Sequence, residues 1–253
     1  MNQKNFFENK IALVTGGTSG IGKEIVKQLL LKGCFVFVNF GHNEEAMYET
    51  KKELKEISDH FKCIKADVSI EDDVFDMMNT IKEKFGRLDF LINNAGINYD
   101  AFIENFDIVL FRKILNVNLI GKVICTKHAI PLLKNSKFPS IVNIASGLGT
   151  RPCEEASAYC AAEAGIINFA QASALELSKY KIRVNTVSPG LTGTPLALAG
   201  WTSDEIEEQK KINPLGRIGE TIDIANTVVY LLSSEANYIN GENINVNGGS
   251  LLK

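Results

Sequence analysis

The chain has 253 residues, of which 45% are hydrophobic and 23% are charged, so it can bury a large core and is too ordinary in composition to be disordered. Its formal net charge is -3, and it contains no long basic block, which argues against a nucleic-acid-binding protein. No apolar run approaches the roughly 18 residues that span a bilayer. We therefore expect a soluble, cytoplasmic protein with no nucleic-acid or membrane partner.

Short runs of β-branched and aromatic residues alternate with amphipathic stretches along the whole chain. The strand-like runs are residues 11–15, 34–40, 62–66, 90–93, 140–146, 183–188 and 242–248, and the helical stretches are 23–33, 44–60, 72–85, 106–133 and 156–179. Strands separated by helices need crossover connections, which produce a parallel sheet covered on both faces. The alternation predicts one doubly wound α/β domain over residues 1–253, a Rossmann fold with a mostly parallel sheet of about seven strands.

One long irregular stretch runs from Pro189 to about Ser203 and precedes a short charged helix, residues 203–211. Structureless stretches of this length inside compact domains are usually lids or binding loops. We interpret residues 189–215 as a segment that covers a substrate pocket, with a solvated surface excursion as the alternative.

The predicted helix that begins near Ala156 is apolar almost all round. Side chains such as Ile166, Phe169 and Leu175 leave no wide polar face. Such a helix is buried on more than one side, so it either lies centrally in the domain or packs against another subunit.

A glycine-rich turn, Thr15 to Gly22, follows the first predicted strand and leads at once into a helix. Glycines let a backbone turn tightly and approach a pyrophosphate closely, while free N–H groups and the dipole at the helix start attract its charge. The spacing of Gly16, Gly20 and Gly22 is that of a TGxxxGxG element. We therefore predict a dinucleotide site at Gly16, Thr18, Ser19, Gly20, Ile21 and Gly22.

The chain resembles the short-chain dehydrogenase/reductase family along nearly its whole length, with the greatest likeness to the bacterial β-ketoacyl-acyl-carrier-protein reductases. Besides the glycine turn, the motifs that carry the resemblance are Asp67-Val68, Asn93-Asn94-Ala95-Gly96, Asn118 in NVNLIG, Ser146 in IVNIAS, Tyr159, Pro189-Gly190 and the tail INGENINVNGG. The resemblance implies reduction or oxidation of a carbonyl or alcohol substrate, small or carrier-bound, by hydride transfer with a nicotinamide cofactor. It also implies a homo-oligomer, a tetramer as in the family.

The resemblance also assigns cofactor contacts by position. Asp67 and Val68 would contact the adenine, Asn94, Ala95 and Gly96 would line the central cofactor path, and Pro189, Gly190 and Thr192 would lie on the nicotinamide side. Asn94 and Gly96 could instead simply shape a turn, and Asp67 could cap the next helix.

The choice between NAD and NADP depends on the end of the second strand, where an acidic residue would bind the ribose 2′-hydroxyl and repel a 2′-phosphate. Asn39 occupies this position and no carboxylate follows it as far as Asn43. The missing carboxylate and the likeness to the family in this segment favour NADP, so we predict NADP as the preferred cofactor. No Arg or Lys is present to hold the 2′-phosphate, so NAD is kept as the alternative.

By resemblance, Tyr159 is the proton donor, Ser146 polarises the carbonyl, and Asn118 holds a water in the proton path. A tyrosine with a free pKa of about 10 is a poor acid–base catalyst near neutral pH. In the family, a lysine four residues after the tyrosine lowers this pKa. Here that position is Glu163, on the same helical face as Tyr159. A unit charge about 5 Å from the phenol, at an effective dielectric constant near 20, shifts the pKa of the phenol by about two units. An ionised Glu163 would raise the phenol pKa, whereas a lysine would lower it.

Three explanations of Glu163 remain open: an active but differently tuned reductase, a dinucleotide-binding protein without redox turnover, or a substitution that silences a reductase. Burial could keep Glu163 protonated, and its carboxyl group could accept bonds from ribose hydroxyls. Arg151 is the one basic residue close in sequence to Ser146 and Tyr159. We favour the reductase class because the other site residues are in place.

Other chemistries lack their motifs. Ser146 is not preceded by the first glycine of a G-x-S-x-G hydrolase elbow, and no Walker lysine follows the glycine turn. The five cysteines and three histidines show no metal-ligand spacing, so we expect neither a bound metal nor a disulfide framework.

Overall fold

The computed structural model describes residues 6–252. Its strands form one seven-stranded sheet in the order β3-β2-β1-β4-β5-β6-β7, and every neighbouring pair is parallel. The strands are β1 (Ile11–Val14), β2 (Phe35–Phe40), β3 (Phe61–Lys65), β4 (Phe90–Asn93), β5 (Ser140–Ile144), β6 (Arg183–Pro189) and β7 (Asn243–Val246). The predicted doubly wound α/β domain is confirmed, and the order of the strands reverses between β1 and β4, where such folds bind ligands.

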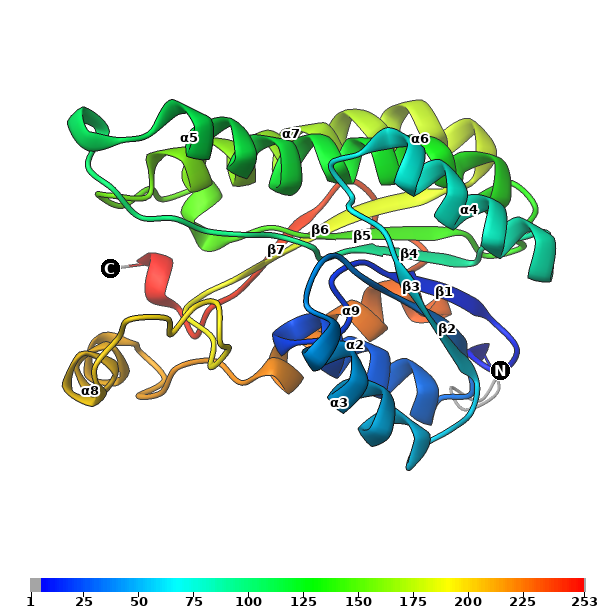
Figure 1. Ribbon diagram of the computed structural model, residues 1–253, viewed down its shortest axis with the longest axis horizontal. Coiled ribbons are helices and arrows are strands. Elements are labelled where there is room, and N and C mark those ends of the chain that lie inside the picture. Colours follow the sequence, from blue (N-terminus) through cyan, green and yellow to red (C-terminus); the bar gives the residue numbers. More distant parts are fainter. Residues whose placement is uncertain (1–5, 253) are drawn as a thin grey trace.

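Helices cover both faces of the sheet (Figure 1). One face carries α2 (Gly20–Leu31), α3 (Glu44–Lys55) and α9 (Thr221–Leu232), and the other carries α4 (Glu71–Phe85), α5 (Ile108–Leu115), α6 (Gly121–Leu133) and α7 (Ser157–Leu177). The charged helix that the sequence predicted over 203–211 is present as α8 (Ser203–Ile212), and it lies beyond the edge of the sheet. Within residues 6–252, no helix is both long enough and apolar enough to cross a bilayer.

The helices differ from the prediction in one early end, one interruption and one helix that was not predicted. The helix expected over 44–60 ends at Lys55, because the chain turns there through hydrogen bonds back to Leu54. The stretch 106–133 is broken by a π-helical turn, Asn116–Ile120, between α5 and α6. Helix α9 was missed, although a capping box formed by Glu220 and Asp223 marks its start.

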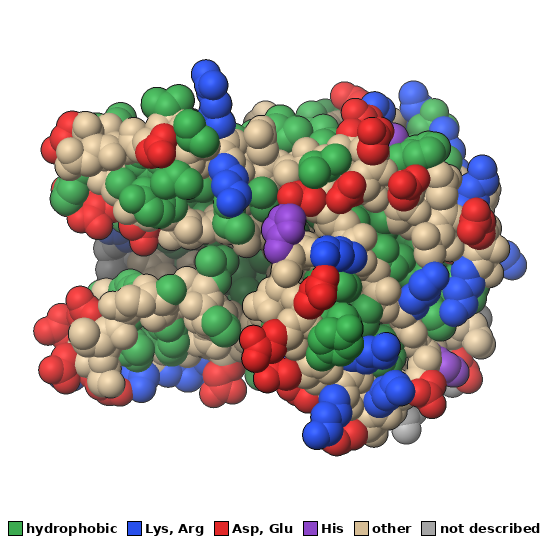
Figure 2. All heavy atoms as spheres, in the orientation of Figure 1, with side chains coloured by type: hydrophobic (Ala, Val, Ile, Leu, Met, Phe, Trp, Pro, Cys, Tyr) green, Lys and Arg blue, Asp and Glu red, His purple; other side chains and the backbone are tan. Residues whose placement is uncertain are grey.

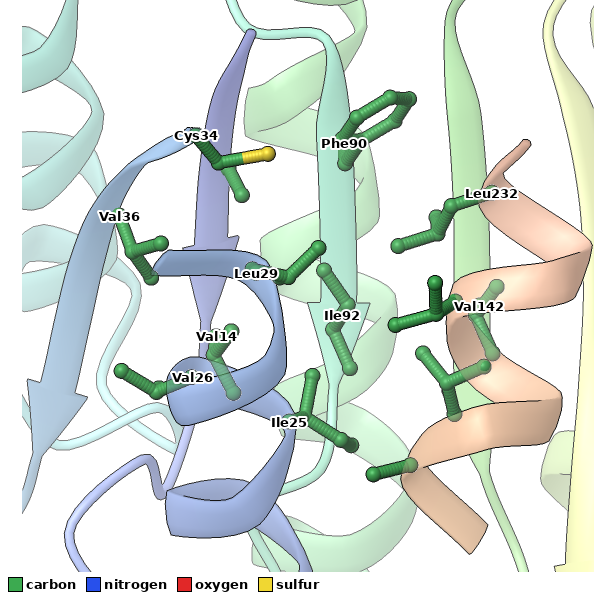
Figure 3. Packing of buried hydrophobic residues seen from close by; sticks show 14 of the residues in the cluster. Val14, Ile25, Val26, Leu29, Cys34, Val36, Phe90, Ile92, Val142 and Leu232 are labelled. Carbon is green, nitrogen blue, oxygen red and sulfur yellow. The ribbon is translucent and has the colours of Figure 1, made fainter. Parts of the chain in front are cut away.

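The core lies in two layers, one on each face of the sheet. Between the sheet and helices α2 and α9, side chains from β1, β2 and β4 interdigitate with those of the helices (Figure 3). The residues of β1 and β4 are all buried, as expected for the central strands of a sheet covered on both faces. This packing holds the carboxyl ends of the central strands in fixed positions, and the site lies at those ends.

Candidate active site

The predicted site residues meet at the carboxyl edge of the sheet. The glycine turn follows β1, Asn94 follows β4, Ser146 comes shortly after β5, and Pro189 ends β6. Figure 2 shows a deep hollow at this edge, between the arm that carries α5 and the arm that carries α8. The carboxyl ends of the strands, which carry the predicted site residues, lie on this side of the molecule (Figure 1 and Figure 2).

The glycine turn requires glycine for steric reasons. Gly16 and Gly20 have φ values of +61° and +49°, a left-handed conformation that other residues rarely adopt. A Cβ on Gly22 would lie 2.3 Å from the carbonyl oxygen of Gly16 and 2.4 Å from Nδ2 of Asn94. The turn is therefore compact enough for its backbone to contact a ligand directly.

The start of α2 is suited to a phosphate group. Ser19 occupies the N-cap position but makes no capping hydrogen bond through its side chain, and the first turn of the helix holds no acidic residue. The helix dipole and the N–H groups of this first turn can therefore act on an anion. The carbonyl of Thr18 accepts a bond of 2.8 Å from the Thr50 hydroxyl, which fixes the turn against α3. The residues present thus fit a pyrophosphate.

Asn94 supports the glycine turn from β4. Its side chain donates to the carbonyl oxygens of Thr15 and Gly16 at 3.0 and 3.1 Å, and its backbone N–H donates to the Thr15 hydroxyl at 2.9 Å. The N–H of Ala95 donates to the same hydroxyl at 3.0 Å. Asn94 therefore has the turn-shaping role that the sequence left open, and its cofactor contact stays a prediction.

Asn39 is buried and its amide is used within the fold. It accepts a bond from the Gly16 N–H at 3.3 Å and donates to the carbonyl of Ala66 at 2.9 Å. The side chain thus joins the glycine turn to the segment after β3 rather than extending outward. Further along, the exposed ring of His42 lies 3.2 Å from the Asp67 carboxylate.

Asp67 accepts hydrogen bonds from the backbone N–H and the hydroxyl of Ser69, at 2.9 and 2.6 Å. Partial burial acts to raise the pKa of Asp67, but the bonds from Ser69 and His42 outweigh it and hold that pKa below its usual value. Asp67 does not cap α4, whose N-cap is Ile70. Val68 packs so closely on α6 that a Cβ on Gly121 would lie 2.9 Å from its side chain.

Ser146 and Tyr159 form the polar pair of the reaction centre. The Ser146 hydroxyl accepts a bond from the Leu148 N–H at 3.1 Å, which leaves its proton free to donate. Tyr159 is in the first turn of α7, half-buried and close enough to Ser146 for the two side chains to interact. Burial raises the pKa of the phenol strongly, Glu163 raises it further, and the interaction with Ser146 only partly offsets them. Tyr159 therefore keeps its proton at neutral pH.

Glu163 lies one turn beyond Tyr159 and is only 1% exposed. Its Oε1 accepts a bond of 2.9 Å from the side chain of Asn118, in the π-helical turn. The Asn118 amide also exchanges two bonds with the backbone of Ile97, at 2.9 and 3.0 Å. Asn118 thus ties Glu163 to the loop after β4, and its predicted contact with a water stays a prediction.

The structure adds a residue that the sequence analysis missed. Lys122 is 3% exposed, donates to the carbonyl of Ile144 at 2.6 Å, and has its Nζ 3.7 Å from Oε2 of Glu163. Arg151, the one basic residue close in sequence to Ser146 and Tyr159, is exposed and donates to the carbonyl of Ser250 at 3.5 Å. The spacing of four between Asn118 and Lys122 carried the signal, since it places both on one helical face.

The segment after β6 is closely packed at Gly190 to Thr192 and then leads away from the sheet to α8. A Cβ on Gly190 would lie 2.8 Å from Asn247, and the buried Thr192 donates to the Gly190 carbonyl at 2.9 Å. Further on, Thr202 and Glu205 form the capping box that starts α8. The predicted nicotinamide-side residues are thus rigidly placed, while the arm beyond them carries α8.

Several proteins that resemble this chain in sequence or fold are named as reductases or dehydrogenases. The sequence profile of the family described as short chain dehydrogenase matches residues 10–204. The chain is 36% identical to the 3-oxoacyl-[acyl-carrier-protein] reductase FabG of Staphylococcus aureus over 241 residues, 95% of this chain and 97% of that protein. It is 32% identical to the cis-4-hydroxycyclohexanecarboxylate dehydrogenase of Sinomonas cyclohexanicum over 244 residues, 96% of this chain and 97% of that protein. The crystal structure of levodione reductase superposes with a TM-score of 0.91 at 30% identity and covers 97% of this chain and 99% of that one. The chain therefore belongs to the short-chain dehydrogenase/reductase family and is an enzyme of that family.

Proposed function

We propose that the enzyme reduces a carbonyl compound to an alcohol with NADPH. When bound, the nicotinamide supplies a hydride to the carbonyl carbon. Tyr159 donates its phenolic proton to the carbonyl oxygen, and the Ser146 hydroxyl donates a hydrogen bond to the same oxygen as charge develops there. The observation that carries the proposal is that Ser146, after β5, and Tyr159, in the first turn of α7, lie within interaction distance of each other at the carboxyl edge of the sheet.

The protonation state of Tyr159 favours the reductive direction. Reduction needs a phenol that still holds its proton, whereas oxidation of an alcohol needs the tyrosinate as a base. Burial and Glu163 both raise the pKa of Tyr159. The reductive proton donor is thus present at every physiological pH, and the oxidative base is scarce.

The cofactor would lie across the carboxyl edge of the sheet. The glycine turn and the start of α2 would hold the pyrophosphate, with Asp67 and Val68 at the adenine and Pro189 to Thr192 at the nicotinamide. NADPH is preferred over NADH in this proposal because the segment from Asn39 to Asn43 carries no carboxylate to repel a 2′-phosphate.

The substrate would enter the hollow between the α5 arm and the α8 arm, with residues 189–215 as its cover. Leu196 and Trp201 are partly exposed on this cover and offer apolar contact. The named substrates of the relatives suggest a 3-oxoacyl thioester or an oxo-substituted ring as the carbonyl compound.

The test is consumption of NADPH and of NADH with a panel of 3-oxoacyl thioesters, diketones and oxocyclohexanecarboxylates. We expect turnover with at least one class, and a higher kcat/KM with NADPH than with NADH. Calorimetric binding of both cofactors without turnover of any carbonyl would contradict the reductase and favour a dinucleotide-binding protein without redox activity.

We also propose that the chain assembles as a homotetramer through α5 and α7, which lie side by side (Figure 1). Val109 on α5 is 71% exposed and Leu175 on α7 is 80% exposed, and a face of this kind is usually covered by a partner. Light scattering after size-exclusion chromatography should give four times the chain mass, and a stable monomer would contradict the assembly.

A further inference from the structure

Two helices each bring a polar pair to the reaction centre. Helix α7 carries Tyr159 and Glu163, and the π-helical turn with α6 carries Asn118 and Lys122. Glu163 lies between them: its Oε1 accepts from Asn118 at 2.9 Å, and its Oε2, buried and without a hydrogen bond, faces Nζ of Lys122 at 3.7 Å. Both charged side chains are almost fully buried.

Neither charge would be stable there alone. Burial raises the pKa of Glu163 and lowers the pKa of Lys122, while the attraction between them acts in the opposite direction on each. Two contacts favour the charged forms: the short bond from Lys122 to the Ile144 carbonyl and the bond from Asn118 to Glu163. When Lys122 is protonated and Glu163 is ionised, the pair carries no net charge.

We propose that Lys122 is a positioning residue that replaces, from α6, the cation expected four residues after Tyr159: it holds Glu163 as an ionised but neutralised carboxylate beside the phenol. The catalytic consequence rests on the proposed reductase function, but the pairing itself does not. It follows that the negative charge of Glu163 beside the phenol is paired, and so weakened, by a cation from another helix rather than standing alone.

Few other titratable groups act on this cluster. Among the described residues, Lys122 is the charged group that acts on Glu163, and Glu163 is the one that acts on Lys122. Cys160 on α7 and Asp100 in the loop after β4 act on Tyr159 and raise its pKa. A change in pH response at Lys122 or Glu163 can therefore be assigned to this pair.

The first test is a double-mutant cycle in thermal stability, measured without substrate or cofactor. We expect Lys122→Met and Glu163→Gln each to lower Tm by on the order of 10 °C, because each leaves one buried group without its partner. The double variant should lose much less than the sum of the two. Lys127→Met, on the exposed face of the same helix, should change Tm by about 1 °C or less. Additive losses would overturn the proposal.

The second test reads the protonation of Glu163 directly. Infrared difference spectra against Glu163→Gln should show no protonated carboxyl band for the unmodified enzyme at neutral pH. In Lys122→Met the lone buried carboxyl should take up a proton, so that the band appears. A merely structural lysine would leave this signal unchanged, and a protonated band in the unmodified enzyme would overturn the proposal.

The third test moves the cation. Glu163→Lys alone places two ammonium groups together, so it should be less stable than Lys122→Met/Glu163→Lys and at least about tenfold less active. Equal stability and activity of the two variants would overturn the proposal. If no variant reduces any carbonyl, the proposed function fails, while the stability cycle and the infrared band still decide whether Lys122 neutralises Glu163.

Discussion

The glycine turn and the reaction centre share one edge of the sheet but are held in different ways. The turn is built from neutral groups whose polar atoms bond the backbone, as Thr15 and Asn94 do. The reaction centre instead buries the opposite charges Lys122 and Glu163 next to a phenol, and one carboxylate oxygen has no hydrogen bond. The glycine turn is therefore held mainly by close steric fit, and the reaction centre is held mainly by the pairing of opposite charges.

This difference determines how each region should respond to mutation. A change in the turn acts through steric clash and should affect stability and cofactor affinity together. A change in the reaction centre acts on proton transfer and should affect kcat more than cofactor affinity. The two regions can therefore be perturbed one at a time.

The largest effect is expected at the reaction centre. Tyr159→Phe removes the proton donor while keeping the ring, so kcat for carbonyl reduction should fall by about 10²–10⁴. Binding of NADPH, measured by calorimetry, should change by no more than about threefold, since the glycine turn is intact. A variant that keeps a tenth or more of the original kcat would mean that another group donates the proton.

A smaller effect is expected in the turn. In Gly22→Ala the new methyl group would lie 2.3 Å from the Gly16 carbonyl oxygen, so the turn must open. We expect a loss of about 1–3 kcal/mol in stability and a roughly tenfold or greater loss of NADPH affinity. Gly41→Ala is the matched control for the loss of stability, because a Cβ there meets nothing within 4 Å and its φ is not positive. Equal losses of stability in the two variants would show that the steric clash at Gly22 is not the cause.

The pH dependence separates the two directions of the reaction. Because the pKa of Tyr159 is raised, the tyrosinate fraction stays small and grows about tenfold per pH unit below that pKa. Alcohol oxidation should therefore rise by about tenfold per unit from pH 7 to pH 9 without a plateau, while reduction should show no loss from deprotonation of the phenol. A plateau of the oxidation rate near pH 8 would show that the phenol pKa is not raised.

Much of the fold and the turn could be predicted because their signals are contiguous in sequence. The alternation of strands and helices predicted the sheet, and the spacing of Gly16, Gly20 and Gly22 predicted the tight turn between β1 and α2. The buried ion pair could not be predicted in the same way, since Lys122 and Glu163 meet only after β5 and two helices have packed. Arg151 was the one basic residue close in sequence to the site, and it donates to the carbonyl of Ser250 instead.

The smallest predicted effect concerns the choice of cofactor at the edge of the turn. His42 is exposed beside Asp67, and His42→Asp would add a carboxylate where a 2′-phosphate is expected. At about 4 Å in water one such repulsion costs about 1 kcal/mol, or roughly fivefold in KM for NADPH. The KM for NADH should not rise, because a carboxylate accepts bonds from the free 2′-hydroxyl. His60→Asp adds the same charge at the opposite end of β3 and should leave both KM values unchanged. If the two variants weaken NADPH equally, the effect is one of net charge, and the segment after β2 does not select the cofactor.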